Sequence, residues 1–286
     1  MRIGITGFCT DETIHPVDLA RAVEERGFDS LWLPEHSHIP TSRESPWPGS
    51  LTGEALPDYY WRSQDAFVAL SMAAAVTERI LLGTSITLVA QRDPIWLAKQ
   101  VASLDHLSGG RVILGVGYGW NREELENHGD DWVNRRTIVR ERVLAMRSLW
   151  NDEVASFDGE FVTVAPSLAR PKPVQPGGPK VVLGGGFGPK LMASIAEWGD
   201  GWMPITARPS LGKRLDPLRE ACARAGRDFA EMDITVMGAT DDPAGLENLQ
   251  SEGITRAALT LWPASADEHL RQLDAWAPLA ARFNGE

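Results

Sequence analysis

The segment from Val181 to Gly201 holds the clearest candidate for a binding site in this sequence. It reads VVLGGGFGPKLMASIAEWGDG: a short apolar strand, three consecutive glycines, and then a helix with Pro189 in its first turn. Glycine lets another group approach the backbone closely. The start of a helix presents free N–H groups and the positive end of the helix dipole. The run Gly184 to Gly186 therefore predicts a phosphate-binding turn. A tight turn without a ligand is the alternative.

This glycine run differs from the dinucleotide-binding fingerprint. That motif needs an acidic residue at the end of the next strand, about 20 residues on, within one compact βαβ unit. Asp200 comes before its strand, which is too early. The segment predicts a site for a phosphate without identifying a nicotinamide cofactor.

A histidine at the end of a predicted strand is the second candidate. His36 comes just after the apolar run SLWLP and follows Glu35 directly. Structural hydrogen bonding and a role at a ligand remain equally open for it. The pair His36 and His38 could also share a metal ion, because alternate residues of an extended segment point the same way. The later strand ends offer no further histidine or acid, so we expect no metal site and interpret His38 as a loop residue.

Other catalytic patterns are absent or weak. The sequence has no G-x-S-x-G nucleophile elbow, and neither cysteine stands beside a histidine at a strand end. We interpret Glu123 and Glu124 as the solvated start of a helix. Lys99 and Asp105 are interpreted as a structural pair or as surface charges, and Arg92 as an exposed residue. None of these predicts a hydrolytic site.

Composition limits the classes of partner. The 286 residues are 43% hydrophobic and 23% charged, with a formal net charge of −11. An acidic chain of this kind is not expected to bind nucleic acid or an anionic membrane. We expect no signal peptide or membrane span, and we expect no disulfide framework from two distant cysteines. These features together favour a cytoplasmic protein that acts on a small molecule.

Strands and helices alternate along the whole chain. We expect strands at residues 2–8, 30–34, 79–87, 111–117, 180–183, 201–205, 232–237 and 255–261, each followed by a helix, at 16–26, 65–76, 94–107, 136–150, 188–198, 211–225, 243–250 and 267–280. Eight such units in this length predict a single α/β domain over residues 1–286, folded as a (β/α)8 TIM barrel. A doubly wound open sheet is the alternative.

Two insertions interrupt this pattern, after the second and the fourth strands. Residues 41–63 form a long loop rich in proline, glycine and aromatic residues, of the kind that often covers a binding site. Residues 154–178 contain FDGEFVTV, which suggests a hairpin, and then a proline-rich connection. The active sites of such barrels lie at the carboxyl ends of the strands. There this sequence offers one glycine-rich corner among apolar and aromatic residues, which suits a flat cofactor that carries a phosphate.

Four stretches together resemble a known family. They are EERGFDSLWLPEH (24–36), AAAVTERILLGTSI (73–86), RDPIWLAKQVASLDHLSGGRVILGVGYGWNREE (92–124), and VVLGGG with DGW (181–202). In this order and at these spacings they resemble the bacterial luciferase-like oxidoreductases, and within them the actinobacterial branch that uses coenzyme F420, a deazaflavin. The resemblance covers most of the first two hundred residues.

This resemblance implies a set of site residues. It places His36 near the reactive edge of the cofactor ring as the catalytic residue, and it places a non-proline cis peptide bond at Ser85–Ile86. Gly184 to Gly186 would take the cofactor phosphate, and Gly117 and Gly119 would let the backbone approach the cofactor. The predicted cofactor-binding residues are Phe8, His36, Thr84, Ser85, Ile86, Gly117, Tyr118, Gly119, Gly184, Gly185 and Gly186.

One position departs from the family pattern. Sugar-phosphate dehydrogenases of this family have an acidic residue after the GVGxG corner, where this chain has Trp120. An apolar substrate therefore fits better than a sugar phosphate. The resemblance predicts hydride transfer between coenzyme F420 and such a substrate, in a homodimer. The alternatives are a monooxygenase that uses reduced FMN and oxygen with a separate reductase, and a flavin-binding protein without turnover.

Overall fold

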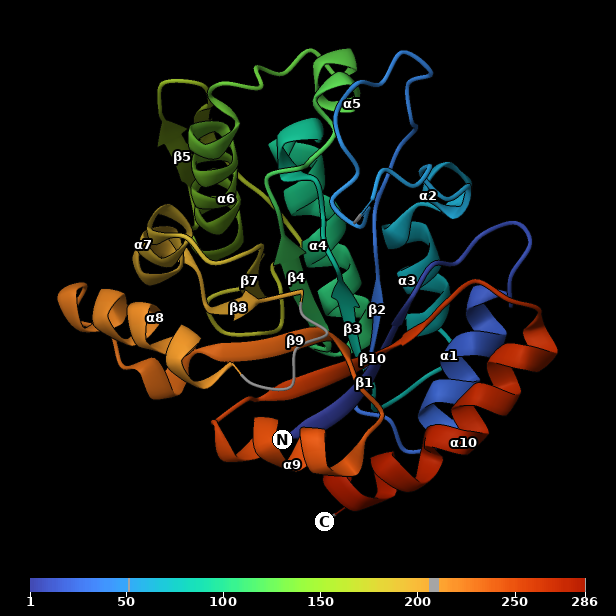
Figure 1. The fold of residues 1–286 in the computed structure, drawn as a ribbon. Helices are drawn as coiled ribbons and strands as arrows, with labels where there is room; N and C mark the ends of the chain where they lie inside the picture. Colours follow the sequence, from blue (N-terminus) through green and yellow to red (C-terminus); the bar gives the residue numbers. More distant parts are fainter. Residues whose placement is uncertain (51, 206–210, 286) are drawn as a thin grey trace.

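The computed structural model describes residues 1–50, 52–205 and 211–285. Its parallel strands close into a barrel in the order β1-β10-β9-β8-β7-β4-β3-β2 (Figure 1). The barrel strands are β1 (Arg2–Gly7), β2 (Ser30–Leu33), β3 (Leu81–Thr84), β4 (Val112–Val116), β7 (Lys180–Gly184), β8 (Gly201–Met203), β9 (Asp233–Ala239) and β10 (Arg256–Leu261). The predicted TIM barrel is confirmed, and the open-sheet alternative is wrong.

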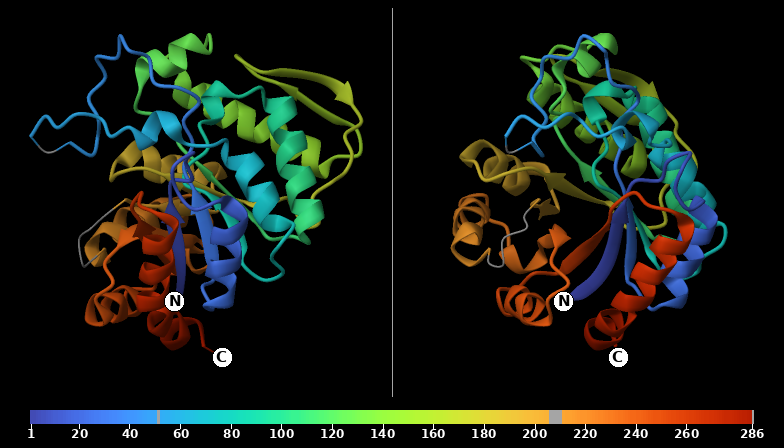
Figure 2. Two further views of the ribbon diagram at one scale, coloured as in Figure 1. Left: turned by 90° about the vertical axis from the view of Figure 1, so that its right-hand side faces the viewer. Right: turned by 45° about the vertical axis from the view of Figure 1, so that its right-hand side comes forward.

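Helices surround this barrel, as the turned views in Figure 2 show. They are α1 (Pro16–Glu25), α2 (Tyr59–Arg62), α3 (Ala66–Ala74), α4 (Pro94–Ser108), α5 (Arg122–Asn127), α6 (Arg135–Asn151), α7 (Pro189–Trp198), α8 (Gly212–Arg224), α9 (Pro243–Ser251) and α10 (Ala266–Asn284), with short 3-10 turns η1 (Val89–Gln91) and η2 (Phe229–Glu231). Each predicted helix is present within a few residues of its expected bounds. Among the described helices, none is long and apolar enough to cross a membrane.

Helix α4 shows how local sequence sets these bounds. The Asp93 carboxylate accepts a hydrogen bond from the backbone N–H of Trp96 at 2.8 Å, and Pro94 occupies the first turn. Gly109 ends the helix in the left-handed conformation, with φ of 71°. These two residues fix where the helix begins, in agreement with the predicted start at residue 94.

The barrel interior is filled around one tryptophan. Trp32 on β2 is fully buried, and its indole N–H donates to Ser30 Oγ at 2.8 Å. A Cβ on Gly83 would lie 2.1 Å from Trp32 Cε3, so the neighbouring strand β3 must carry glycine at this level. Ile113, Val182, Met203, Met237 and Ala258 complete this inner cluster. The interior is therefore a packed core, and any site must lie at its mouth.

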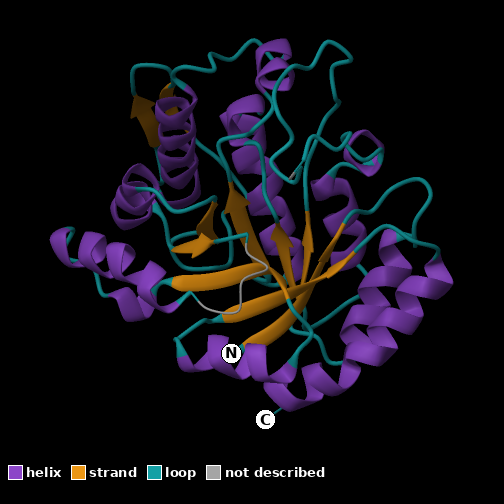
Figure 3. Ribbon diagram, viewed as in Figure 1, coloured by secondary structure: helices purple, strands orange, loops and turns teal. Residues whose placement is uncertain are grey.

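The insertion after β4 forms the predicted hairpin (Figure 3). Strands β5 (Ala155–Asp158) and β6 (Thr163–Ser167) pair antiparallel. The proline-rich connection that follows is anchored by Asp105 on α4, which is fully buried and accepts the Val174 N–H at 2.8 Å. Lys99 instead donates to the carbonyl of Arg170. The prediction that Lys99 and Asp105 form a pair or lie as surface charges is therefore wrong for Asp105.

Candidate active site

The mouth of the barrel holds a buried hydrogen-bonded contact between His36 and a carboxylate. This residue follows β2, and its side chain is 7% exposed. Nδ1 of His36 lies 2.8 Å from Oε2 of Glu124, whose side chain is fully buried at the start of α5. The Ser37 N–H donates to the other carboxylate oxygen of Glu124 at 3.0 Å. Two segments that are 88 positions apart in the sequence thus meet beside the strand ends.

This position corrects the interpretation of Glu124 as a solvated residue. Asn121 caps α5 by accepting the Glu124 N–H at 3.2 Å, and the first helical turn then directs the Glu124 side chain inward. The neighbouring Glu123 accepts the N–H groups of Glu44 and Ser45 at 2.9 and 3.1 Å. Helix α5 therefore holds His36 with one carboxylate and the loop 41–58 with the next. In Figure 1 this loop and α5 lie side by side above the strand ends.

Trp120 contacts the second ring nitrogen of His36, Nε2. Its indole Nε1 donates to Nε2 of His36 at 3.3 Å, and the two rings meet edge to face at 5.6 Å. The guanidinium of Arg43 lies over the indole at 5.6 Å. The position that carries an acid in sugar-phosphate dehydrogenases therefore supplies a hydrogen-bond donor here.

An aromatic cluster from the loop and α2 covers this region. Tyr60 lies 5.2 Å from His36 and 6.1 Å from Trp120 between ring centroids, and Phe8 lies 5.1 Å from Tyr60. The Trp47 indole donates to the Tyr60 hydroxyl at 2.9 Å, which fastens the loop to α2. Burial raises the pKa of Tyr60, so its hydroxyl stays protonated at neutral pH. The predicted covering loop thus supplies an apolar, aromatic surface next to His36.

The peptide bond between Ser85 and Ile86, after β3, is cis. This confirms the bond that the family resemblance implied. The Ser85 hydroxyl lies 3.1 Å from that of Thr6, and Ile86 extends across the strand ends of β4 and β7. A Cβ on Gly117 would lie 2.1 Å from Ile86 Cδ1, and one on Gly184 would lie 2.7 Å from Ile86 Cγ2. Ile86 therefore packs into the room that these two glycines leave.

Two of the predicted cofactor-binding residues, Thr84 and Gly117, pack within the barrel wall, and their contact with a cofactor stays a prediction. Thr84 is 2% exposed, and its hydroxyl donates to the Gly115 carbonyl at 2.9 Å, so its side chain supports the barrel wall. Gly117 is buried beneath Ile86, and the absence of its side chain makes room for Ile86. Gly119 has φ of 74°, a conformation that favours glycine. Tyr118 is half-buried under the guanidinium of Arg136, at 4.2 Å.

The glycine corner after β7 is open at the start of α7. Gly188 is the N-cap, and it supplies no side chain to cap the helix. Among the described residues, no acceptor lies in hydrogen-bonding range of the N–H groups of Gly186 and Phe187. A Cβ on Gly186 would meet no atom within 4 Å. Unpaired N–H groups, open space and the positive end of a helix dipole are the features that an anion needs.

Arg92 is part of an ion pair at the mouth. Its Nε lies 2.8 Å from Glu35 Oε1, and its Nη2 lies 2.7 Å from Asp65 Oδ2. Burial raises the pKa of Glu35, and the Arg92 guanidinium opposes that rise. The expectation of an exposed Arg92 is wrong. The pair fixes the segment that ends in His36 against α3 and the start of α4.

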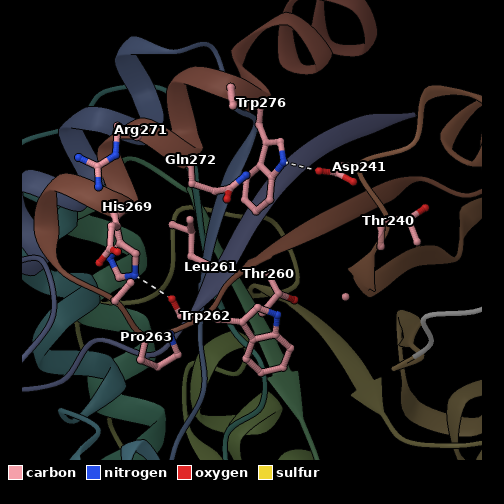
Figure 4. A pocket seen from close by; sticks show the side chains of 15 residues that line it. Thr240, Asp241, Thr260, Leu261, Trp262, Pro263, His269, Arg271, Gln272 and Trp276 are labelled. Atoms are coloured by element: carbon pink, nitrogen blue, oxygen red, sulfur yellow. Dashed lines mark hydrogen bonds between the residues drawn. The ribbon is translucent and has the colours of Figure 1, made fainter.

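A cavity of about 840 Å³ lies beside the mouth, between the ends of β9 and β10 and the helix α10 (Figure 4). Trp262, Trp276, Leu261 and Asp241 are among its lining residues, and Trp276 donates to Asp241 at 2.9 Å. None of the predicted site residues lines it. The ring of its lining residue Trp262 lies 6.5 Å from that of Tyr59 in the aromatic cluster.

The histidines near the site do not form a metal cluster. His38 and His128 both contact the hydroxyl of Ser37, at 2.9 and 2.7 Å. Within residues 1–50, 52–205 and 211–285, no three His, Cys, Asp or Glu side chains are placed to hold a metal ion together.

Glu124 and Arg92 are the site residues whose contacts sequence reasoning missed, whereas Tyr60 lies in the predicted covering loop. A weak signal existed for the first, because Asn121 and Glu124 have the spacing of an N-cap residue and the third helical position. That spacing predicts where α5 begins. It carries no information about the contact with His36.

Comparisons with known proteins agree with this architecture. The model of a family described as luciferase-like monooxygenase matches residues 13–240. An uncharacterized protein of Mycobacterium tuberculosis is 42% identical over 270 residues, which cover 94% of each chain. The crystal structure of monooxygenase RslO1 from Streptomyces bottropensis superposes with a TM-score of 0.78 at 21% identity, covering 97% of this chain and 98% of that one. An F420-dependent secondary alcohol dehydrogenase superposes with a TM-score of 0.75 at 20% identity, covering 98% and 99%. This chain therefore belongs to the luciferase-like monooxygenase family.

Proposed function

We propose that this protein is an oxidoreductase that transfers a hydride between coenzyme F420 and an apolar organic substrate beside His36. One observation carries the proposal: the uncapped start of α7, with its open glycine corner, lies at the same barrel mouth as the buried His36–Glu124 pair. The first suits the phosphate of a cofactor, and the second suits proton handling next to its ring. Ile86 spans the distance between β3 and β7.

The residues present fit a phosphate-bearing flat cofactor. The space beside Gly186 is open, and no acceptor in the described part of the chain pairs with the N–H groups of Gly186 and Phe187. Phe8, Ser85, Ile86, Tyr118 and Gly119 stand at the strand ends around the mouth, where a ring system could lie. When bound, the deazaflavin would supply the hydride chemistry, and the protein would supply position and a water-poor environment.

The protein side of the chemistry centres on His36. It would orient the cofactor ring or exchange a proton with the substrate at Nε2, while Glu124 holds the ring of the histidine in place. The cluster of Trp47, Tyr59 and Tyr60 would exclude water and contact an apolar substrate. The adjacent cavity of about 840 Å³ has the size of pockets that bind small organic molecules, and it could take the bulk of a large substrate.

The alternative function is an FMN-dependent monooxygenase. The same barrel and phosphate corner would serve FMN, and the family and the RslO1 structure are both described as monooxygenases. The preference for F420 comes from the four sequence stretches that resemble the F420-using branch. Under the FMN alternative, a separate reductase would supply reduced cofactor. We further propose that the protein acts as a homodimer.

Titration of the purified apoprotein with F420 and, separately, with FMN tests this proposal, with cofactor fluorescence as the readout. We expect saturable binding of F420 and much weaker binding of FMN. Preference for FMN would transfer the assignment to oxygen chemistry. Binding of neither cofactor would overturn the proposal and leave the glycine corner as a turn without a ligand.

A further inference from the structure

We propose that Glu124 and Trp120 are positioning residues that hold His36 as the tautomer with its proton on Nδ1, so that Nε2 begins each turnover as a proton acceptor. The inference deepens the proposed function and rests on it for its catalytic consequence. Its structural part concerns only the arrangement of His36, Glu124 and Trp120, and it can be tested on the apoprotein.

The first step is the state of Glu124. Its Oε1 accepts the Ser37 N–H at 3.0 Å, and the Ser37 hydroxyl lies 3.4 Å from the same oxygen. Its Oε2 faces His36 Nδ1 at 2.8 Å. An ionised carboxylate accepts hydrogen bonds and donates none. Nδ1 of His36 must therefore carry the proton in this contact.

The second step is the other ring nitrogen. Nε2 of His36 lies 3.3 Å from Nε1 of Trp120. An indole nitrogen is a donor only, so Nε2 must present its lone pair. Both contacts select the tautomer with its proton on Nδ1. Trp120 lies in the segment that links β4 to α5, and Glu124 lies in the first turn of α5. The hydrogen bond made by one nitrogen of a histidine sets the state of the other.

The consequence of this tautomer is that a proton moves from the substrate to His36. A substrate group X–H that approaches Nε2 can give up its proton: the X–H bond breaks, its electron pair stays on X, and a new N–H bond forms at Nε2. The resulting imidazolium is balanced by the carboxylate of Glu124 at 2.8 Å. The Trp120 indole must leave Nε2 before this transfer, because the nitrogen has one lone pair and two N–H groups would otherwise face one another. Trp120 thus favours neutral His36, and Glu124 stabilises the charged form once it has appeared.

The substitution Glu124→Gln offers a sharp test. The amide oxygen would keep the bond from the Ser37 N–H, which leaves the NH₂ group in the place of Oε2, facing His36 Nδ1. That group is a donor, so Nδ1 must become the acceptor, and the proton must move to Nε2, which also displaces the Trp120 indole because its N–H can no longer donate there. We therefore expect the tautomer to reverse. Trp120→Phe removes the indole donor but keeps Glu124, so it should retain the tautomer of the unmodified protein.

The measurement is a ¹⁵N–¹H long-range correlation spectrum of the apoprotein with ¹⁵N-labelled histidine, in which His36 is assigned by loss of its signals in His36→Gln. The protein has six histidines, so the spectrum is simple. We expect a protonated Nδ1 and an unprotonated Nε2 for His36 in the unmodified protein, and the reverse in Glu124→Gln. Glu126→Gln is the matched control, because Glu126 is on the same helix and pairs with Arg122 on the surface. It should leave the His36 signals unchanged.

Turnover adds a second readout. If His36 acts as proposed, Glu124→Gln should lower kcat by about tenfold or more while KM and cofactor affinity stay close to those of Glu126→Gln. A protonated Nε2 in the unmodified protein, or unchanged His36 signals in Glu124→Gln, would overturn the inference. Unchanged signals of the other five histidines would show that Glu124→Gln has folded. If it has not folded, the tautomer of His36 in the unmodified protein and in Trp120→Phe still tests the inference, because both should carry the proton on Nδ1. Failure to bind F420 would overturn the proposed function alone, because the tautomer is read without cofactor.

Discussion

The six-membered ring of Trp32 lies directly over the Cα of Gly83, on the adjacent strand of the barrel. A Cβ at position 83 would come within 2.1 Å of Cε3 and 2.3 Å of Cζ3 of that ring. Trp32 is fully buried, and its indole N–H is held by Ser30, so the ring has no free direction in which to move. The size of one residue on β2 therefore dictates the absence of a side chain on β3.

We expect Gly83→Ala to destabilise the protein by about 1–3 kcal/mol, because it overpacks the barrel interior. Trp32→Leu alone should also destabilise, since it leaves a cavity. In the double variant the added methyl group occupies part of that cavity. The free energy of unfolding, measured in urea, should therefore fall by less than the sum of the two single effects. Additive losses would contradict this account.

Replacement of Gly186 by Asp should weaken cofactor binding without loss of stability. A side chain at this position meets no atom within 4 Å, so folding is not disturbed. A carboxylate at the start of α7 would repel a phosphate by about 1 kcal/mol or more, equivalent to at least about a fivefold rise in Kd. Gly186→Asn is the matched uncharged control and should bind more tightly than Gly186→Asp. Equal Kd values for the two variants would exclude a phosphate from this corner.

His36→Ala should abolish most turnover and leave cofactor binding in place. Acid–base groups contribute about 10²–10⁴-fold to rate, so we expect a loss of kcat in that range. Fluorescence titration reports cofactor affinity separately. An unchanged rate of product formation would show that His36 is not catalytic. No product in any variant, or in the unmodified protein, would instead favour a binding protein without turnover.

Arg92→Leu should destabilise the protein by about 3 kcal/mol at neutral pH, because it leaves the buried carboxylate of Glu35 without its cation. Burial already raises the pKa of Glu35, and loss of Arg92 would raise it further. The penalty applies to the charged form, so the deficit of Arg92→Leu should shrink as the pH falls and Glu35 takes up a proton. Arg122→Leu, which removes a surface pair with Glu126, should show no comparable change. A deficit that is constant with pH would contradict the role of Glu35.

The hydrogen bonds from the backbone N–H groups of Glu44 and Ser45 to the Glu123 carboxylate should persist in mild acid. Burial opposes the shift, but hydrogen bonds from Ser45 and Glu44 dominate and lower the pKa of Glu123 to about 2. Because the pKa is lowered, the stabilisation from these hydrogen bonds is fully present above the usual pKa of 4.5. It is lost only as the pH falls toward 2 and the carboxylate takes up a proton. Amide hydrogen exchange at Glu44 and Ser45, corrected for intrinsic rates, should therefore be equally protected from about pH 5 to about pH 8. Glu123→Gln should reduce this protection at each pH.

The sequence predicted the barrel well because its signals are local. Alternating apolar strands and capped helices, such as Asp93 and Pro94 before α4, fix the element order, and eight repeats leave few topologies. The candidate site was predicted only in part. The positions of His36 and the glycine corner follow from strand ends, which are also visible in sequence.

The contacts of Glu124, Arg92 and Asp105 were not predictable from sequence, because each depends on a partner more than fifty positions away. A charged residue in a helix is by default solvated, and only the packed chain shows that Glu123 and Glu124 of α5 have different partners. The packing of Ile86 into Gly117 is of the same kind. A glycine after a strand indicates that space for a side chain is left free at that position, but the sequence does not show which group occupies that space.

Two adjacent carboxylates of helix α5 make hydrogen bonds with different parts of the chain. Glu123 accepts the backbone N–H groups of Glu44 and Ser45 in the loop, and Glu124 contacts Nδ1 of His36. Because the two residues are consecutive on six residues of helix, we expect a displacement of the loop to reach His36, the acid–base group of the proposed function. Entry of substrate and exit of product would then interrupt the alignment of His36 once in every cycle. The rate at which the loop settles back would set an upper limit on turnover, whatever the speed of the hydride step.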